Sequence, residues 1–534
     1  MKSNKIFIED WLKNKPYNNH NSIDIEYLTI SNKIYKKFDE YFSIFDTLDV
    51  TRQEMKDLAV FLSAYLEDLV SDTQIWNAFI SIHKREYKKP LPFYEESNYT
   101  DEEVNKIDIQ FLIWYYFNIT NPERFLSPYD EYLNVLAGEV FEILNNEYEY
   151  VSENEILKQH YLLKPNSDFY ETRSTIQKIL FESYLFGIDS KTKLNEKIID
   201  SFSEKNQLEK NEQLRLINSI TDSHTHSYRT KLLAYKGKDW LSEIIGKEHN
   251  LFNSVKNISD KISSWFLYKG QTTTHIHFKH IASDIIFDLT KESFNANFEL
   301  TDNHIYYIEM ILWNNEWTFS GITLRKDFDA NLILDEKNDM LKINLGTQFD
   351  KQIQIETKIA LQKQEEIFID IYKSPIIFID AKDVKVTLEH FMNYHNNSLS
   401  KNEAEANRKL EETKQIQKEK GYFGEDPNLD IVEEGNYVIY YNPNSGIEMF
   451  NNICNIFPDK NNPFYKGENV NEIKMFLFSP IYSKELTEYY IEKYADKCGF
   501  FKTGTGKKYL HDFDFLLRFW KNENYYTKPS ITLI

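Results

Sequence analysis

The stretch that decides the fold of the first half of the chain is Leu58–Tyr94, which reads LAVFLSAYLEDLVSDTQIWNAFISIHKREYKKPLPFY. In its first dozen residues apolar side chains recur at spacings of three and four, and other apolar or small side chains fill the opposite side. This pattern predicts a helix packed on most of its faces. Ser71 and Gln74 have the spacing of a capping box, which predicts the start of a second helix. Pro90 ends that helix, so the stretch predicts two consecutive helices.

The same helical spacing continues through the first half of the chain, and residues 1–235 are predicted to form an all-helical domain. After Lys261 the pattern changes to segments rich in β-branched and aromatic residues. Ile305–Trp313 and Trp317–Leu324 flank a short polar break, which predicts a β-hairpin. The expected fold class is therefore α+β, with antiparallel hairpins in the central region.

The second half is predicted to contain a mixed α+β domain over residues 236–400, a charged helical connector over 401–425 and a small α/β domain over 426–534. The connector carries interleaved charges of both signs, which is typical of a solvated helix. The elements expected in this half are a second hairpin from Leu332–Leu334 and Met340–Leu345, strands at Pro375–Asp380, Tyr437–Tyr441 and Lys474–Phe478, and helices at Val384–Tyr394, Ile447–Ile456 and Glu485–Tyr494.

The composition bounds the class of protein. A chain of 534 residues exceeds the size of a single core, so about two to four domains are expected. The hydrophobic content of 41% and the aromatic content of 15% exclude a mainly disordered chain. Cys454 and Cys498 are too few for a disulfide framework, which indicates two buried thiols in a reducing compartment. The start of the chain lacks a secretory apolar region, so a cytoplasmic location is expected.

The net charge bears on the partners. A formal charge of −21 repels nucleic acid and anionic membranes at long range, so a protein that binds either needs a local basic patch. No segment of the sequence carries a convincing one. Protein partners are therefore expected, without a membrane, and the charge disfavours nucleic acid.

Several blocks of sequence resemble a known family. They are Ile6–Tyr17, Leu58–Phe79 and Ile107–Tyr116 in the first half, and Tyr440–Phe450, Asn462–Tyr465, Phe478–Tyr494 and Phe513–Trp520 in the second. In these phrases the chain is similar to an uncharacterised bacterial family known only as a domain of unknown function. The resemblance implies a cytoplasmic bacterial protein without an assigned activity, and it carries over no catalytic residue.

The sharpest candidate chemistry is the sequence Asp222–His226, DSHTH. On a strand, His224 and His226 would point to one face, where both could bind a metal ion. Amidohydrolases and related metal-dependent hydrolases open with a similar DxHxH motif. However, the preceding residues are closer to a helical pattern, and no Gly-rich βα alternation follows. A solvated pair of loop histidines is the alternative.

A second pair, His275 and His277, lies on a predicted strand and is followed by His280. If this segment faces the first pair, the histidines of the two segments are candidate zinc or iron ligands. Chance is the competing explanation, because the chain has 13 histidines.

Three carboxylates, Glu67, Asp68 and Asp108, lie inside apolar helical segments, as the ligands of di-iron bundles do. Those bundles also need two Glu-x-x-His motifs, and no histidine of this chain follows a glutamate at that spacing. The acids are instead predicted to cap neighbouring helices or to pair with Lys or Arg, which offsets the cost of burying a charge.

Weaker patterns have ordinary explanations beside them. Asp350 with Glu356 and Lys358, on an apparently alternating segment, is faintly similar to a nuclease D...ExK arrangement, which arises easily in a Lys- and Glu-rich chain. Thr503–Lys507 lacks the residue pattern of a P-loop and is better explained as a flexible turn.

Aromatic residues gather around the predicted hairpin. Trp317 and Phe319 share one face of a strand, close to Trp313, and could stack on a ligand or pack in a core; core packing is the default.

The leading hypothesis is a non-enzymatic interaction or regulatory protein that has no cofactor and binds other proteins. It leads because no catalytic motif meets its own requirements. The alternative is a metal-dependent hydrolase or nuclease that binds a divalent metal through His224, His226, His275 and His277.

Overall fold

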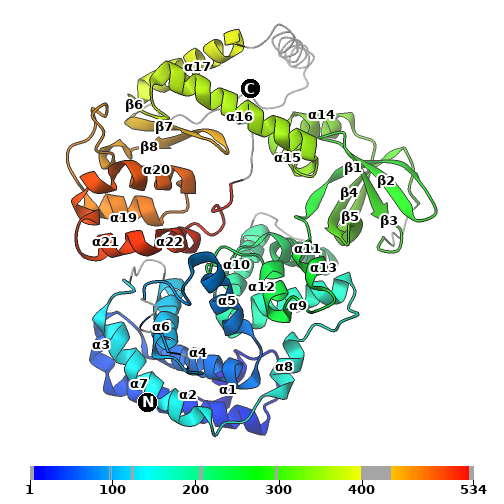
Figure 1. Cartoon of the computed structure of the whole chain (residues 1–534). Helices are drawn as coiled ribbons and strands as arrows, with labels where there is room; N and C mark the ends of the chain where they lie inside the picture. The colour runs from blue at the N-terminus through cyan, green and yellow to red at the C-terminus, as the bar shows by residue number, and fades with distance from the viewer. Residues whose placement is uncertain are drawn as a thin grey trace. The chain divides into compact units, whose positions relative to one another are not determined.

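A computed structural model describes residues 5–94, 97, 99–100, 102–121, 126–203, 209–294, 299–398 and 434–527 (Figure 1). The chain forms two compact units. The first comprises Met1–Asp260 and Lys508–Asn522, and the second comprises Lys261–Lys507 and Glu523–Ile534. The structure is 58% helix and 13% strand. With a helical N-terminal region and with sheets in the central and C-terminal parts, it confirms the α+β class.

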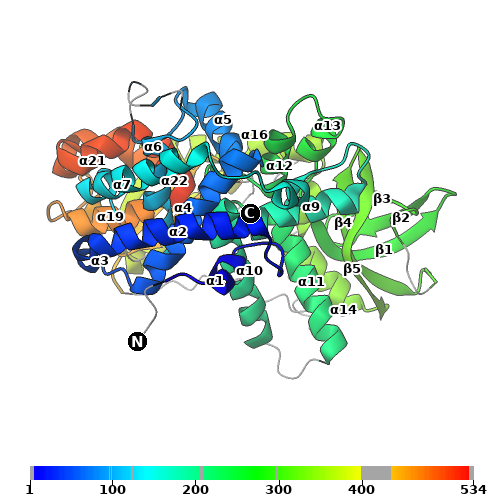
Figure 2. The same cartoon turned by 90° about the horizontal axis from the view of Figure 1, so that it is seen from below.

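The first unit is built from helices (Figures 1 and 2). Two of them, α4 (Arg52–Ser71) and α6 (Lys106–Thr120), are buried over most of their length, which confirms for α4 the prediction of a helix packed on most of its faces. The others are α1 (Ile8–Leu12), α2 (Ser22–Glu40), α3 (Phe42–Thr47), α5 (Ile75–Tyr87), α7 (Glu131–Tyr148), α8 (Glu155–Tyr161), α9 (Phe169–Glu182), α10 (Tyr184–Ser203), α11 (Lys210–Ser227), α12 (Gly237–Ile245), α13 (Phe252–Lys256) and α22 (Phe513–Trp520).

The last helix of the chain, α22, belongs to the first unit although almost 400 residues separate it from α6. Its Phe515 ring lies 6.1 Å from the ring of Phe111 on α6, and its Phe519 ring lies 4.9 Å from that of Trp114. Aromatic pairs at such distances contribute stability beyond the area that they bury. The first unit is therefore completed by a segment from the far end of the chain.

The second unit begins with a closed five-stranded barrel in the order β1-β2-β3-β5-β4. Strand β1 pairs antiparallel with both β2 and β4, and β3 runs parallel to β5. This order and these directions are those of the OB-fold, a small Greek-key barrel. The strands are β1 (Ile262–Gln271), β2 (His275–His280), β3 (Ile286–Thr290), β4 (His304–Trp313) and β5 (Glu316–Asp327).

The hairpin predicted from the aromatic segments is confirmed as β4 and β5, which turn through Asn314 and Asn315 at φ of 51° and 65°. Asparagine tolerates this left-handed conformation, which a two-residue hairpin turn requires. Trp317 and Phe319 pack into the barrel core, against Phe287 at 4.9 Å and Phe294 at 5.4 Å respectively. The aromatic side chains of the hairpin therefore serve the core.

After the barrel come three helices, α14 (Ala330–Asn338), α15 (Met340–Thr347) and α16 (Lys351–Tyr372). The predicted second hairpin is wrong, and so is the alternating strand that included Glu356 and Lys358. Each helix begins at an aspartate, in turn Asp329, Asp339 and Asp350, whose carboxylate accepts two backbone N–H bonds of the first turn. Such N-caps stabilise a helix start by about 1 kcal/mol, and this local signal prevails over short apolar alternation.

A second sheet has the order β6-β7-β8, with all pairs antiparallel. One face packs against α16 and α17, through a core that includes Phe368, Phe391 and Tyr441. On the other face, the ring of Tyr440 lies 5.7 Å from Tyr489 of α20. The elements are β6 (Ile376–Asp380), α17 (Val384–Ser398), β7 (Asn436–Asn442), β8 (Gly446–Asn451), α19 (Val470–Phe478), α20 (Lys484–Tyr494) and α21 (Gly504–Tyr509).

Two predictions in this region are wrong. Ile447–Ile456 was expected as a helix, but its first half forms β8, because Ile447 and Glu448 pair with β7 across a turn at Asn442–Gly446. Lys474–Phe478 was expected as a strand, but it lies in α19, whose start is capped by the side chain of Asn469. The predicted connector over residues 401–425 lies outside the described residues.

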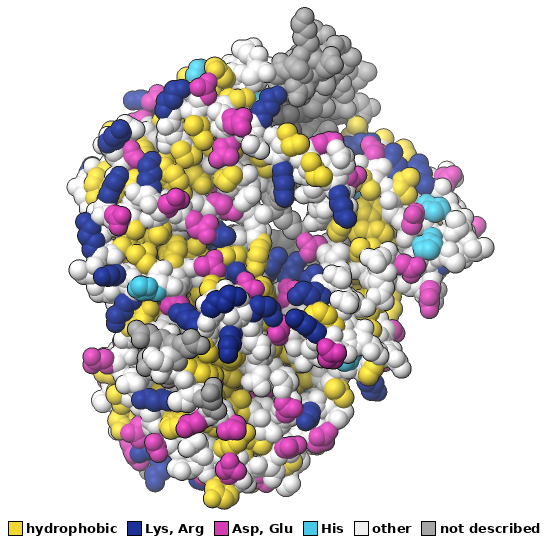
Figure 3. Space-filling view, in the orientation of Figure 1, with side chains coloured by type: hydrophobic (Ala, Val, Ile, Leu, Met, Phe, Trp, Pro, Cys, Tyr) yellow, Lys and Arg dark blue, Asp and Glu magenta, His cyan; other side chains and the backbone are white. Residues whose placement is uncertain are grey.

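Among the described helices, none combines the length and apolar character that a membrane span requires. On the face in Figure 3, acidic and basic side chains are interspersed.

Candidate functional site

The first histidine pair lies near the end of helix α11, and both side chains are buried, with His224 1% and His226 5% exposed. The prediction of a solvated loop pair is therefore wrong, and so is the placement of the pair on a strand. Residues two apart on an α-helix point roughly 200° away from each other. His224 and His226 therefore do not share the single face that the metal-hydrolase hypothesis required.

Each ring of this pair has partners within the first unit. His224 Nε2 lies 3.1 Å from the carbonyl oxygen of Ser190, and its ring stacks on Tyr228 with centroids 4.4 Å apart. Burial lowers the pKa of His224 to about 4. His226 Nε2 lies 3.8 Å from Asp222, which also accepts a hydrogen bond from Arg173 at 2.8 Å. These contacts tie α11 to its neighbours.

The second pair is on strand β2 as predicted, in the second unit. His275 and His277 alternate with buried Ile276 and Phe278, so the two imidazoles share the outer face of the barrel. His277 Nδ1 lies 2.6 Å from the carboxylate of Asp288 on β3. In the part of the chain that the structure describes, no group of three or more His, Cys, Asp or Glu side chains is arranged to hold a metal ion.

The outer face of β2 and β3 is the surface that binds oligonucleotides in many OB-folds. Single-strand binders combine a basic groove with aromatic side chains on which bases stack. Here Phe278 and Phe287, the two aromatic residues of these strands other than histidine, are buried inside the barrel. The basic side chain of Lys279 is paired with Asp284 at 2.7 Å. The face therefore carries neither feature.

Asp68 and Glu67 have the structural roles predicted for the acids of the first unit, whereas Asp108 is held by aromatic side chains instead. Asp68 caps α5, because its carboxylate accepts backbone N–H bonds from Ile75 at 3.2 Å and Trp76 at 2.7 Å. Gln74 has φ of 65° and its side chain does not cap the helix. The predicted capping box is therefore wrong, since the cap of α5 comes from Asp68 and not from Ser71, although both residues lie on α4.

Glu67 is fully buried and forms an ion pair with Lys15, which is also buried. The other carboxylate oxygen of Glu67 accepts a hydrogen bond from Asn154 Nδ2 at 2.8 Å. Burial lowers the pKa of Lys15, and the negative charge of Asp24 opposes this. Lys15 also lines a cavity of about 300 Å³ in this unit, but its contact with Glu67 commits the ammonium group to an internal partner.

Asp108 accepts hydrogen bonds at one carboxylate oxygen from Trp76 Nε1 at 2.7 Å and from Tyr65 at 2.9 Å. Burial raises the pKa of Asp108 to about 7. The carboxyl group therefore joins three helices, α4, α5 and α6, through a polar contact inside an aromatic core.

The weaker motifs also have structural explanations. Asp350 caps α16, and Glu356 and Lys358, two residues apart on that helix, point away from each other. Of Thr503–Lys507, the residues from Gly504 onward form the start of α21, with Gly504 at φ of 63°. Cys454 and Cys498 are buried thiols, and burial raises the pKa of both.

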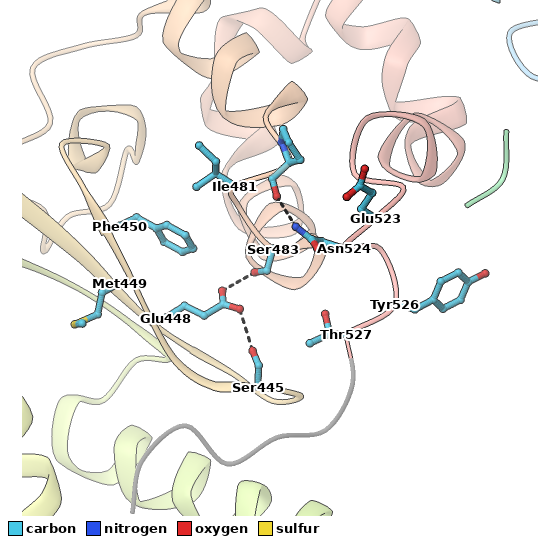
Figure 4. A pocket seen from close by; sticks show the side chains of 11 residues that line it. Ser445, Glu448, Met449, Phe450, Ile481, Ser483, Glu523, Asn524, Tyr526 and Thr527 are labelled. Carbon is cyan, nitrogen blue, oxygen red and sulfur yellow. Dashed lines mark hydrogen bonds between the residues drawn. The ribbon is translucent and has the colours of Figure 1, made fainter. Parts of the chain in front are cut away.

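A further candidate site is a cavity of about 470 Å³ in the second unit, which Figure 4 shows from close by. Strand β8, the start of α20 and the segment after α22 line it. The volume is within the range of small-ligand pockets, which is about 300–1,000 Å³. Its lining residues are Ser445, Glu448, Met449, Phe450, Pro480, Ile481, Ser483, Glu523, Asn524, Tyr526 and Thr527.

Glu448 is the central polar group of this cavity. It accepts hydrogen bonds from Ser483 at 2.6 Å, from Ser445 at 3.0 Å and from Asn442 Nδ2 at 2.8 Å. Ser483 is itself fixed, because its hydroxyl oxygen accepts the backbone N–H of Leu486 and thereby caps α20. The carboxylate is thus held in one orientation by short, rigid partners (Figure 4).

The charge of the cavity is negative. Burial raises the pKa of Glu448, and the nearby charge of Glu485 raises it further, whereas the three hydrogen bonds lower it. Glu523 adds a second carboxylate to the lining, and none of the described lining residues is Lys, Arg or His. Phe450 and the exposed Ile481 supply apolar walls. A ligand with a cationic head and an apolar stem fits such a surface.

The sequence pattern did not single out this cavity. Glu448 was assigned to a predicted helix, and nothing in the sequence links it to residues 523–527. The one usable signal is Asn442–Gly446, a turn sequence that is typical of a hairpin and would have placed Glu448 on a strand.

A family described as "Protein of unknown function (DUF3843)" matches residues 5–267. The predicted resemblance to a family of unknown function is thereby confirmed for this part of the chain, which contains Glu67, Asp68 and Asp108. The C-terminal phrases that also suggested it, and the Glu448 cavity, lie outside the matched residues. Neither a curated protein nor a solved structure matches the chain.

Proposed function

We propose that the protein is a non-enzymatic interaction protein of the bacterial cytoplasm, and that the Glu448 cavity binds an arginine or lysine side chain of a protein partner. The observation that carries the proposal is the Glu448 carboxylate itself. It lies in a concave surface with no basic side chain among its described lining residues, and it is held by Ser445, Ser483 and Asn442.

A guanidinium or ammonium group adds a positive charge and further N–H donors to a carboxylate whose described hydrogen-bond donors are all neutral. Hydrogen bonds between ionised groups are about twice as strong as neutral ones, and desolvation inside a cavity strengthens them further. The aliphatic stem of the same side chain can lie along Met449, Phe450 and Ile481. Arginine anchors of this kind are frequent hot spots of protein interfaces.

The composition of the cavity favours binding over catalysis. Among its described lining residues there is no histidine, cysteine or lysine that could act as a base or nucleophile beside Glu448. The Ser483 hydroxyl donates to Glu448 and accepts from Leu486, so both functions of the hydroxyl are used within the fold.

A selection from a random peptide library on the full-length protein tests the proposal. The expected result is enrichment of peptides that share an arginine or lysine at one position, with Glu448→Gln reducing their recovery roughly tenfold or more. Glu492→Gln, an exposed position on α20, is the matched control and should leave recovery unchanged. Peptides without a shared basic residue, or equal recovery by Glu448→Gln, would contradict the proposal.

A further inference from the structure

The second unit contains another cavity whose charge is opposite to that of the Glu448 cavity. It has a volume of about 410 Å³ and is lined by Lys373, Ser374, Asp459, Lys460, Asn461, Lys493 and Lys497. Four lysines against one aspartate leave a formal excess of three positive charges. The fold thus assembles a basic site in a chain whose net charge is −21.

Three separate segments supply these lysines. Lys373 ends α16 with φ of 56°, and Ser374 follows it toward β6. Lys460 lies in the turn that precedes α19. Lys493 lies in the last turn of α20, and Lys497 lies in the short helical turn just after it. The sequence shows no basic run because the lysines are up to 124 positions apart.

A simpler explanation is that lysine favours helix C-termini, where it complements the helix dipole. This accounts for Lys373 and Lys493. It does not account for Lys460, which lies in a turn and, among the described residues, has no carboxylate partner. It also leaves Lys497, whose ammonium group lies over the Tyr494 ring at 5.1 Å, with no described carboxylate partner.

Asp459, the one acid among the described residues that line the cavity, already has partners. Asp459 accepts hydrogen bonds from Tyr494 at 2.8 Å and from the backbone N–H of Asn461 at 3.0 Å. It also pairs with Lys493 at 3.2 Å. Asp459 therefore shapes the turn and neutralises Lys493, while Lys373 pairs with Asp370, outside the lining, at 3.0 Å. The positive charges of Lys460 and Lys497 remain for a ligand.

We propose that this cavity binds a small ligand that carries two or more linked phosphate groups. Lysine is a common phosphate partner that acts as a compact point charge, and several lysines around one concavity fit a di- or triphosphate better than a single phosphate. The hydroxyl of Ser374 and the amide of Asn461 provide further polar groups at the same surface. The cavity is formed by residues other than those of the Glu448 cavity, so the two proposals stand separately.

Isothermal titration of the full-length protein with inorganic phosphate, inorganic triphosphate and ATP tests the proposal. Triphosphate and ATP should bind roughly tenfold or more tightly than phosphate, with an affinity that falls as salt rises. Equal affinities for triphosphate and ATP would identify the phosphate chain as the recognised group. Tighter binding of ATP than of triphosphate would identify a nucleotide as the ligand that carries the phosphate chain. Both results support the proposal.

The double variant Lys460→Glu/Lys497→Glu should reduce triphosphate affinity roughly tenfold or more. Lys385→Glu, at an exposed position on α17, is the control and should have no effect. The proposal would be overturned if triphosphate and ATP did not bind, or if the double variant bound them as tightly as the unaltered chain. It would also be overturned if a single-stranded 12-mer DNA bound more tightly than both with the same dependence on Lys460 and Lys497, because the site would then serve a nucleic-acid backbone.

Discussion

The buried acids of the first unit and Glu448 of the second unit are the same kind of group in different surroundings. Glu67 and Asp68 are 0% and 3% exposed, and their oxygens face a lysine, an asparagine and backbone N–H groups of the same unit. Glu448 is also hydrogen-bonded, but it lines a cavity. The carboxylates of Glu67 and Asp68 are bonded within the first unit and stabilise it. The carboxylate of Glu448 remains accessible to a ligand.

This difference shows that burial and a shifted pKa do not by themselves mark a functional group. Asp108 has a raised pKa and helps to join three helices, whereas the pKa of Glu448 is raised at the wall of a cavity. What separates them is whether space for another molecule lies beside the oxygen atoms.

The largest loss of folding stability is expected for Glu67→Ala. Removal of one partner leaves Lys15 buried without its counter-charge, which costs about 3–5 kcal/mol. Hydrogen exchange of α4 in a denaturant series measures this cost for the first unit. The double variant Lys15→Met/Glu67→Leu should be less destabilised than the single variant, because no unpaired charge remains. Equal stability of Glu67→Ala and the unaltered protein would contradict the structural role of Glu67.

A pH dependence is expected from Asp108. Its pKa is raised to about 7 in the folded state, against about 3.9 for an unfolded aspartate. Between these values the folded state retains a proton that the unfolded state has lost. The stability of the first unit therefore falls as the pH rises from about 4 to about 7, by at most about 1.4 kcal/mol per pH unit from this group.

Asp108→Asn keeps an acceptor for Trp76 and Tyr65 but cannot titrate. The difference in unfolding free energy between this variant and the unaltered protein, followed by hydrogen exchange in α6, should change with pH in that range. If the difference in unfolding free energy stayed constant with pH, the ionisation of Asp108 would not destabilise the folded state.

A smaller effect, about 1–2 kcal/mol, is expected for Asp68→Ala, which removes the cap of α5. Because the lost acceptor serves the N–H groups of Ile75 and Trp76, exchange should accelerate most at the start of α5. Asp72→Ala, at the exposed C-cap of α4, is the control. Uniform acceleration over the whole unit would argue against a local cap.

The smallest effect on stability is expected for Glu448→Gln, below about 1 kcal/mol, because the amide oxygen of glutamine still accepts from Ser445 and Asn442 and its NH2 group can donate to the hydroxyl oxygen of Ser483. The effect of Glu448→Gln on the binding of a basic peptide should be larger than its effect on stability. A basic peptide requires the ionised carboxylate, so affinity should be present above the raised pKa of Glu448 and be lost as the pH falls through it. Fluorescence titration measures the affinity for a basic peptide at each pH. An affinity that does not change with pH would show that binding does not depend on the ionised carboxylate of Glu448.

Much of the fold follows from the sequence, because local patterns determine it. The all-round apolar segments give α4 and α6, and the Asn314–Asn315 turn gives the β4–β5 hairpin. The errors arise where two local signals compete. Asp329 and Asp339 cap helices over residues whose short apolar alternation resembles strands, and the first histidine pair lies on a helix for which the preceding residues already gave the correct pattern.

The candidate sites could not be predicted, because tertiary structure assembles them. The Glu448 cavity combines β8 and the start of α20 with residues 523–527, and the lysine cavity combines segments around residues 373, 460 and 493. Neither set has a spacing that a sequence motif records. The histidine pairs, in contrast, have a regular spacing, but the rings of the first pair are buried among partners within their own unit.

Whether the Glu448 cavity binds a basic side chain can be measured by ligand-observed NMR with the full-length protein, by comparing acetyl-arginine-methylamide with its neutral isostere acetyl-citrulline-methylamide. We expect the arginine compound to bind and the citrulline compound to bind at least about tenfold more weakly. Glu448→Gln should abolish this difference, and Glu492→Gln should preserve it. Equal binding of the two compounds, or an arginine preference that survives Glu448→Gln, would contradict the assignment of this cavity to a basic side chain.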